Sequence, residues 1–270
     1  MIKNKIIVVR GAGDIATGSI QKLVRAGFPV IATEIAYPSA IRRYVSLCEA
    51  VYEDTWTVED ITSIFVKSIT EAVVAIKSSK VPIIIDPSCN IIKELQPFAV
   101  VDATLAKKNL GMTKDLAPIT IALGPGFIAG KDVDIVVETM RGHNLGRLIM
   151  EGTSISNTGI PGIIAGYGAE RVIHAPYKGI IHNEKTIGEN VKKGEIIATI
   201  NGKPVLATID GILRGLIRDG FNVSKGFKIA DIDPRISEKE NCFTITDKAR
   251  CIGGAVLEAI LQQSHKMGRN

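Results

Sequence analysis

The sequence has few cysteines, few aromatic residues and no long hydrophobic run. None of the four cysteines forms a Cys-x-x-Cys pair, since they stand at Cys48, Cys89, Cys242 and Cys251. Without such a pair, and without a secretion signal at the start of the chain, we expect neither a zinc knuckle nor a disulfide framework. No apolar run approaches the roughly 18 residues that span a bilayer. The sequence therefore predicts a cytoplasmic protein without membrane contact.

Charge and composition limit the class of ligand. The net charge is +5, lysines and glutamates are interspersed, and aromatic residues make up only 5% of the chain. Nucleic-acid binding is not predicted from such a surface, whereas an anionic small molecule suits it. The 270 residues, 46% of them hydrophobic, are enough for one large domain or two ordinary ones.

The start of the chain has the pattern of a nucleotide-binding fold. An apolar run at residues 6–9 leads into Gly11-Ala-Gly-Asp-Ile-Ala16 and then into a helical pattern. Such a turn brings backbone amides close to a pyrophosphate, and an acid about 20 residues later accepts hydrogen bonds from a ribose. The sequence therefore predicts dinucleotide binding by Gly11, Gly13, Asp14 and Glu34. The alternative is a turn that only packs, because the Asp14 carboxylate would repel a phosphate unless it points away or caps the helix.

Later apolar runs also deliver polar residues at their carboxyl ends. Residues 81–85 lead to Asp86, residues 98–101 lead to Asp102, and residues 119–123 lead to a second glycine turn. In an open sheet of parallel strands these ends share one edge, where ligands bind. We expect a strand-end crevice there, with only one of the two adjacent lysines facing it, and further binding residues at Lys107, Lys108, Asn109, Gly124 and Gly126.

The segment from Glu138 to Arg147 is crowded with polar side chains and contains two glycines. This composition is typical of a binding loop, although a glycine-rich turn before a polar helix is the alternative. His143 is a candidate proton carrier in the segment, and its anion-binding candidates are Arg141, Asn144 and Arg147. The acids and the histidine come from different predicted strands, so no metal site is predicted.

Two helices are predicted outside this pattern. Residues 40–51 form the first, and residues 247–262 form the second, with Thr246 as its N-cap. Gly253 and Gly254 inside the second helix cost about 1 kcal/mol each relative to alanine, which indicates close packing against another backbone. The helix would then return to cover the first domain.

The second half contains an internal repeat. Residues 175–200 match residues 207–232 without a gap at an offset of 32, with equivalent glycines, valines and lysines. The pattern predicts a two-fold β barrel-sandwich and resembles the biotinyl and lipoyl carrier fold. Lys203 lies at the corresponding hairpin, but the motif expected around a modified lysine is absent, which favours a structural or docking barrel.

The predicted fold class is α/β. A Rossmann-like, mostly parallel sheet occupies residues 1–168, a small β barrel-sandwich (biotinyl/lipoyl-like) domain occupies residues 169–236, and a C-terminal helical segment occupies residues 237–270.

Several blocks together resemble the YqeB family, accessory proteins of selenium-dependent molybdenum hydroxylases. These blocks are the segments 10–18, 107–111, 123–127, 138–147 and 240–246. The resemblance implies an accessory role in maturation of the molybdenum site, with a nucleotide-containing or selenium-containing species in the strand-end crevice. It also implies partners among molybdenum hydroxylases or their cofactor-assembly proteins. The candidate cofactor is a dinucleotide, either NAD(P) or molybdopterin dinucleotide.

Other functions stay open at this point. An NAD(P)-dependent oxidoreductase would use Glu34 for the ribose and His143 as general acid or base. A noncatalytic adaptor would dock through its barrel. Cys242 is a candidate carrier of selenium or persulfide, with a buried thiol as the alternative. The sequence decides neither whether the chain is an enzyme nor whether it forms a homo-oligomer.

Overall fold

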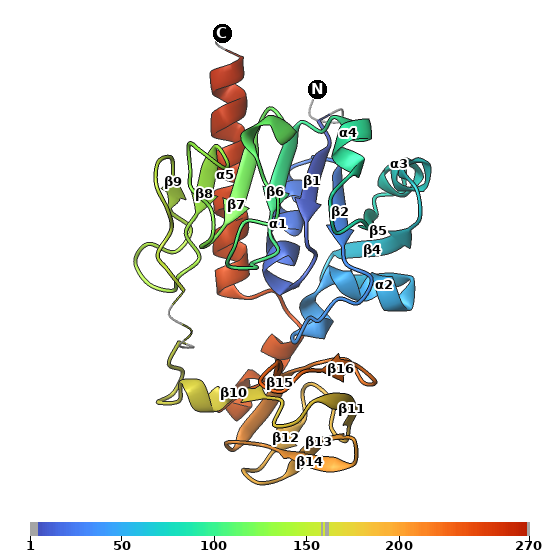
Figure 1. The fold of residues 1–270 in the computed structure, drawn as a ribbon, viewed down its shortest axis with the longest axis vertical. Coiled ribbons are helices and arrows are strands. Elements are labelled where there is room, and N and C mark those ends of the chain that lie inside the picture. Colours follow the sequence, from blue (N-terminus) through green and yellow to red (C-terminus); the bar gives the residue numbers. More distant parts are fainter. Residues whose placement is uncertain (1–4, 158, 160–161, 269–270) are drawn as a thin grey trace. The chain divides into compact units, whose positions relative to one another are not determined.

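A computed structural model describes residues 5–157, 159 and 162–268 (Figure 1). The chain divides into two compact units: unit 1 is Met1–Pro38, Ser46–Asn157 and Ile245–Asn270, and unit 2 is Ser39–Val45 and Thr158–Thr244. These boundaries differ from the predicted ones. Residues 39–45 belong to unit 2 because Leu216 N–H donates to the Ile41 carbonyl and Gly215 packs against Ile41.

Unit 1 contains a sheet of nine strands in the order β3-β4-β5-β2-β1-β6-β7-β8-β9. The seven strands from β4 to β8 in this order pair in parallel, and β3 and β9 pair antiparallel at the two edges. The strands are β1 (Ile7–Arg10), β2 (Val30–Glu34), β3 (Thr55–Val58), β4 (Ile61–Val66), β5 (Val81–Ile85), β6 (Ala99–Asp102), β7 (Thr120–Leu123), β8 (Ile135–Val137) and β9 (Leu148–Ile149).

The order of the parallel strands creates a topological switch point. From β1 the chain adds β2, β4 and β5 on one side, and then returns to add β6, β7 and β8 on the other. Ligands of open α/β sheets bind at such a reversal, beyond the carboxyl ends of the strands. In this sheet the reversal lies between β1 and β6.

Helices cover both faces of this sheet because its strands are apolar on both sides. The helices of unit 1 are α1 (Asp14–Arg25), α2 (Ala50–Glu53), α3 (Ile69–Lys77), α4 (Ile91–Leu95) and α5 (Asp247–Met267). Figure 1 shows α1 and α5 together on one face. On the other face, α3 and α4 pack against side chains that include Val8, Ile31 and Ile84. The predicted mixed α/β fold with a large, mostly parallel sheet and a C-terminal helix is confirmed.

The predicted helix over residues 40–51 is wrong. The structure has two short 3-10 turns, Arg43–Val45 and Leu47–Glu49, followed by the four residues of α2. The segment does not continue as one helix because its first part hydrogen-bonds with β15 of unit 2, through Ile41 and through Arg43 Nε, which donates to the Leu216 carbonyl.

Helices α1 and α5 pack with almost no space between their backbones. A methyl carbon on Gly253 would lie 2.4 Å from the Gly18 carbonyl oxygen, and one on Gly18 would lie 2.4 Å from the Ala249 carbonyl oxygen. The predicted close approach is therefore confirmed at Gly253, whereas Gly254 has no atom within 4 Å of such a carbon. Since Gly18 meets Ala249 and Lys22 meets Gly253, the helices run in the same direction and begin at the same end of the sheet.

The start of α5 is set by a side-chain cap. Thr246 Oγ1 accepts a hydrogen bond from the Ala249 N–H at 3.1 Å, which confirms the predicted N-cap.

Among the described residues, no helix combines the length and the apolar character that a bilayer crossing would require.

Unit 2 is built from two four-stranded antiparallel sheets, β10-β17-β15-β12 and β14-β13-β11-β16. Each of the first four strands of the unit has an equivalent strand 32 residues later, among the last four. The two equivalent strands always lie in different sheets. The strands are β10 (Val172–His174), β11 (Gly179–Asn183), β12 (Asn190–Val191), β13 (Ile196–Ile200), β14 (Lys203–Leu206), β15 (Gly211–Leu216), β16 (Asn222–Val223) and β17 (Lys228–Asp233).

Backbone hydrogen bonds follow the same repeat. Gly188 N–H donates to Leu213 while Gly220 N–H donates to Ile181, and Gly194 donates to Ala207 while Gly226 donates to Ala175. The isoleucines, valines and alanines of both halves form one buried core. The repeat seen in the sequence is thus a repeat of hydrogen bonding and packing.

Candidate functional site

The glycine turn joins the end of β1 to the start of α1. Gly11 has φ +87°, which favours glycine, and the next N–H, of Ala12, donates to Glu34 Oε1 at 2.7 Å. Glu34 Oε2 accepts the Ile35 N–H at 3.0 Å. Burial raises the pKa of the Glu34 carboxyl, and these two N–H groups counteract part of that rise. Each oxygen keeps a second lone pair, so the carboxylate is held in place and can still accept from a ribose hydroxyl.

The N-terminus of α1 has an open position. Gly13 is its N-cap residue, contributes no side-chain cap, and has no atom within 4 Å of the point where a Cβ would stand. The carboxylate of Asp14 accepts the N–H of Ile15 at 2.9 Å, so it bonds to the first turn of the helix. An anion therefore has space beside Gly13, but it would lie close to the charge of Asp14.

Three loops from neighbouring strand ends meet around this turn. A Cβ on Gly11 would lie 3.3 Å from the Ala103 carbonyl oxygen, beyond β6. One on Gly126 would lie 2.5 Å from the Lys108 backbone nitrogen, and one on Gly124 would lie 2.6 Å from Thr139 Oγ1. The structure thus brings the carboxyl ends of β1, β6, β7 and β8 together at one edge through glycine contacts.

The loop after β6 places both lysines on the surface. The side chains of Lys107 and Lys108 are exposed, and Lys107 has φ +62°. Asn109 holds the loop, since its side-chain oxygen accepts the N–H groups of Gly111 and Met112. The structure therefore gives Asn109 a role in loop geometry and leaves the two lysines available to solvent.

A buried ion pair lies directly beneath the switch point. Arg10 Nη1 donates to Asp102 Oδ2 at 2.9 Å, and the two residues are only 3% and 0% exposed. The second Asp102 oxygen accepts from the N–H and hydroxyl of Thr104, and Arg10 Nη2 donates to the Leu110 carbonyl. The pair ties the end of β1 to the loop after β6. Sequence patterns place both residues at strand ends but do not show that β1 and β6 are neighbours.

Asp86, at the end of β5, serves a helix. Its carboxylate accepts the Ile91 N–H at 2.9 Å and the side-chain amide of Asn90 at 3.2 Å. Both oxygens of the Asp86 carboxylate therefore accept hydrogen bonds at the start of α4.

The polar segment from Glu138 to Arg147 divides into two parts. Glu138 is 3% exposed, and its carboxylate accepts the N–H groups of Met140 and Ile155 at 2.7 and 2.8 Å. Arg141 forms a two-point ion pair with Asp247 at the start of α5, at 2.8 and 3.0 Å. This pairing holds the pKa of the Asp247 carboxyl well below its usual range.

The later part of the segment faces a different region. His143 and Arg147 line an open groove of 470 Å³ against α5, together with Leu145, Gly146, Leu148, Met150, Glu258 and Gln262. Asn144 is exposed, and its carbonyl accepts the Arg147 N–H. Glu258 is ten residues beyond Lys248 on α5, about 15 Å along the helix. The expected single crevice that would hold the histidine, the arginines and the glycine turn together is therefore not what the structure shows.

Lys248 was not among the residues predicted from the sequence. It is half-buried in the first turn of α5, and its charged neighbours are Arg141, Asp14, Glu138 and Asp247. Burial lowers the pKa of its ammonium, Arg141 lowers it further, and the three carboxylates oppose that shift. No local pattern could have revealed this residue, because its neighbours come from the glycine turn and the end of β8.

Cys242 belongs to unit 2, whereas the strand-end residues belong to unit 1. It is 2% exposed, and burial raises the pKa of its thiol more than nearby Arg42 and Arg214 lower it. A buried thiol with a raised pKa is a poor nucleophile. This placement favours the alternative of a structural thiol.

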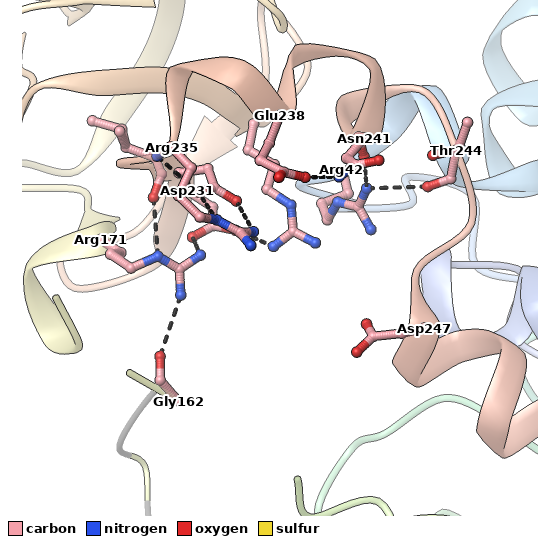
Figure 2. A network of polar contacts seen from close by, with 12 residues as sticks. Arg42, Gly162, Arg171, Asp231, Arg235, Glu238, Asn241, Thr244 and Asp247 are labelled. Carbon is pink, nitrogen blue, oxygen red and sulfur yellow. Dashed lines mark hydrogen bonds and ion pairs between the residues drawn. The ribbon is translucent and has the colours of Figure 1, made fainter. Parts of the chain in front are cut away.

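Unit 2 also holds a network of polar contacts, which Figure 2 shows from close by. Arg171 and Arg214 each approach a different oxygen of buried Asp231 at 3.3 Å, and Arg235 binds Asp233 at two points. Arg42 donates to the Asn241 carbonyl at 2.9 Å. The network connects β15 and β17 to the segments before and after the two sheets.

Lys203 stands at the start of β14, beside the hairpin turn. Its ammonium lies 5.1 Å from the centre of the Tyr177 ring. This contact engages the lysine in a cation–π interaction.

The fold and the strand-end edge define a mixed α/β protein with a glycine turn at the switch point of a large, mostly parallel sheet. The chain is 46% identical over 263 residues to the uncharacterized protein YqeB of Escherichia coli strain K12, an alignment that covers 97% of this chain and 48% of that protein. The chain therefore spans about half the length of the curated relative it matches, with 48% covered. The match supports the resemblance to the YqeB family. No protein-family model matches the chain.

Solved structures resemble the chain only weakly. A succinylglutamate desuccinylase/aspartoacylase of Rhodobacter sphaeroides is 15% identical over 86% of each chain, with a TM-score of 0.28. A succinylglutamate desuccinylase of a Silicibacter species and the product-bound ectoine utilization protein EutE (DoeB) of Ruegeria pomeroyi are 12% and 10% identical over 85% of each chain, both with a TM-score of 0.26. Scores of this size support no inference about fold or function.

Proposed function

We propose that this chain is a YqeB-family accessory protein for the maturation of selenium-dependent molybdenum hydroxylases, and that it binds a nucleotide-containing species at the strand-end edge of unit 1. The family part rests on the 46% identity to the Escherichia coli protein. The binding part is carried by one observation, the open Gly13 position at the N-terminus of α1, beside the switch point. Its partners in this proposal are the hydroxylase or its cofactor-assembly proteins, in the cytoplasm.

The geometry of the edge supports a nucleotide in a definite orientation. The phosphates lie at Gly13, where N–H groups and the helix dipole favour an anion. The ribose lies at Glu34, whose strand partner in β5 is Ile85. Ile35 and Ile85 are 47% and 39% exposed and offer an apolar surface to the base. The remaining part of the ligand then points toward Thr139 and the two lysines of the β6 loop.

The sheet in this proposal is Rossmann-like, since β5-β2-β1-β6-β7-β8 repeats the strand order of dinucleotide-binding sheets. Unit 2 is proposed as a barrel-sandwich hybrid. This part is supported by the equivalence of strands 32 residues apart, since the members of each equivalent pair lie in different sheets.

Replacing Gly13 by aspartate tests the binding site without disturbing the fold. Gly13 has φ −68° and free space at its Cβ, and aspartate is a preferred N-cap, so Gly13→Asp should leave the melting temperature unchanged or slightly higher. The added carboxylate would repel the phosphates and should weaken nucleotide binding about tenfold or more. Calorimetric titration with ADP, CDP, GDP, NAD and molybdopterin dinucleotide measures both the affinity and the preferred base.

Gly13→Ser is the matched control, because it adds a capping side chain without charge. It should keep most of the affinity that Gly13→Asp loses. Absence of binding of every nucleotide by the unchanged protein would overturn the binding proposal.

The maturation role is tested separately in cells that lack the gene for this protein. Hydroxylase from such cells should be inactive, and the unchanged chain should restore its activity whereas Gly13→Asp should not. Full hydroxylase activity in the deletion strain would contradict the role.

Fewer observations support the alternative function, that of an NAD(P)-dependent oxidoreductase. Glu34 suits the ribose of a nicotinamide cofactor, but His143 lines the groove beside Glu258 and Gln262. Binding of NAD without turnover of any reduced cofactor would leave this alternative without a basis.

A further inference from the structure

A groove runs along the second half of α5 and contains none of the residues of the proposed nucleotide site. Its volume is 470 Å³, with the helix as one wall and residues of the segment 143–150, which includes β9, as the other. The two walls touch at Gly146, since a Cβ there would lie 2.9 Å from Cys251 Sγ. The groove residues of the helix, Glu258 and Gln262, come about two and three turns later along α5.

The two walls of the groove carry opposite charges that do not pair. Arg147 stands on the loop wall and Glu258 on the helix wall. Neither side chain forms a hydrogen bond or an ion pair with any other residue that the structure describes. The same two segments do form an ion pair at the start of α5, where Arg141 binds Asp247 at 2.8 Å. The groove thus keeps a guanidinium and a carboxylate apart, so that both are available to a ligand.

The backbone holds both charged residues in place. The Arg147 carbonyl accepts the N–H of Glu138 at 3.0 Å, and the Arg147 N–H donates to the Asn144 carbonyl at 3.0 Å. Glu258 is fixed by the hydrogen bonds of α5. A ligand between the two walls therefore orders side chains but not backbone, which lowers the entropic cost of binding.

The remaining groove residues add apolar and neutral polar groups. Leu148 and Met150, two residues apart on the strand wall, provide apolar contact, and Met150 is 39% exposed. His143 and Gln262 offer further donors and acceptors on the two walls. A complementary ligand has a carboxylate for the guanidinium, an ammonium for the carboxylate and an apolar part. Sites for small molecules have volumes of roughly 300 to 1,000 Å³, a range that includes this groove.

We propose that the groove binds a small zwitterion with an apolar side chain, of the class of α-amino acids and dipeptides. Arg147 binds its carboxylate and Glu258 binds its ammonium group, while the apolar side chain lies against Leu148 and Met150. This site goes beyond the proposed nucleotide site and does not depend on it, because the two share no residue.

The test compares three ligands by calorimetry with the full chain. Leucyl-leucine has both charges, its C-terminal amide lacks the carboxylate, and its N-acetyl form lacks the ammonium group. The unchanged protein should bind leucyl-leucine about fivefold more tightly than either derivative, the size expected when one partly exposed ion pair is lost.

Two variants assign each charge of the ligand to one wall. Arg147→Gln should weaken leucyl-leucine binding about fivefold and should no longer distinguish it from the amide. Glu258→Gln should weaken it by a similar factor and should no longer distinguish it from the N-acetyl form. Both side chains are exposed, so the melting temperature should stay the same.

Charge controls come from a helix outside the groove. Lys93→Gln and Glu94→Gln remove the same two charges from exposed positions of α4. Neither variant should change the affinity for leucyl-leucine. A loss of affinity in these controls equal to that in the groove variants would overturn the assignment, because it would show an effect of net charge alone.

Cys251 reports where the ligand binds. Of the four cysteines, all of which the structure describes, Cys251 is the exposed one, and its thiol donates to the carbonyl of Leu145, a groove residue, at 3.5 Å. Saturating leucyl-leucine should slow the reaction of Cys251 with a maleimide, measured from the intact mass. Glu258→Gln should need about fivefold more ligand for the same protection.

The possible outcomes separate this proposal from the nucleotide site. Absence of leucyl-leucine binding overturns the proposal, and so does binding that both groove variants leave unchanged or that leaves Cys251 equally reactive. Weaker binding in both variants together with protection of Cys251 supports it. The affinity for ADP should be equal in the unchanged protein and in the groove variants, so either result leaves the nucleotide proposal to its own test.

Discussion

Replacing Asp102 by asparagine should destabilise unit 1 by about 3 to 5 kcal/mol. Asp102 and Arg10 are almost completely buried and 2.9 Å apart. Asparagine keeps the shape of the side chain but leaves the guanidinium of Arg10 as an unpaired charge in the core. Denaturant unfolding should show the loss as a lower midpoint with an unchanged slope.

The double variant Arg10→Met with Asp102→Leu separates the cost of an unpaired charge from the value of the pair. Apolar residues of similar volume often replace a buried ion pair at little cost. The double variant should therefore be more stable than Asp102→Asn alone. Equal stability of the two would contradict this explanation.

A surface pair of the same chemistry supplies the control. Arg25 and Asp60 are 2.7 Å apart, but both side chains are 48% exposed. Asp60→Asn should therefore cost less than about 1 kcal/mol. The hydrogen bond from Arg25 lowers the pKa of Asp60 to about 2 in the folded protein, so its contribution is present above the unfolded pKa and is lost as the pH falls toward about 2. In Asp60→Asn this acid-dependent contribution should be absent.

Gly253→Ala should destabilise unit 1 by about 2 to 3 kcal/mol, although alanine is the better helix former. The new methyl group would lie 2.4 Å from the carbonyl oxygen of Gly18, a backbone atom that cannot rotate away. The two helices would have to separate, and the apolar contact between them would weaken. Thermal and denaturant unfolding both measure this loss.

The neighbouring residue is a matched control in the same helix. Gly254 has open space at its Cβ, so Gly254→Ala should stabilise the protein by up to about 1 kcal/mol through helix propensity alone. Opposite signs at two adjacent glycines are the expected result. A loss of similar size at both positions would mean that the close helix contact does not determine the effect.

Much of the local structure was predictable because short-range physics decides it. The run before Gly11 becomes a strand, the turn needs φ +87° at Gly11, and Thr246 caps α5 through a hydrogen bond that spans only three residues. The repeat was visible because the same side chains recur at the same spacing in both halves of unit 2. Each of these features depends on near neighbours in the chain.

The sequence predictions that differ from the structure have one cause in common. Residues 40–51 have a helical pattern, but Ile41 hydrogen-bonds with β15, more than 170 residues later. His143 and Arg147 follow a strand end closely in sequence, but the chain turns at Gly142 and Gly146 and places them against Glu258. In both cases a long-range contact overrides the local pattern.

Residue spacing and short-range hydrogen bonding specify the glycine turn, the acid at the end of β2, the two-fold repeat and the capped C-terminal helix, so these features are predictable without the structure. Two further features follow from tertiary packing: β1 lies beside β6, so that Arg10 pairs with Asp102, and α5 runs along α1, so that the two helices begin at the same end of the sheet. These pairings depend on strand order and on the close contact at Gly18 and Gly253. Both arise when distant segments bury their apolar faces together, and no local spacing encodes that choice.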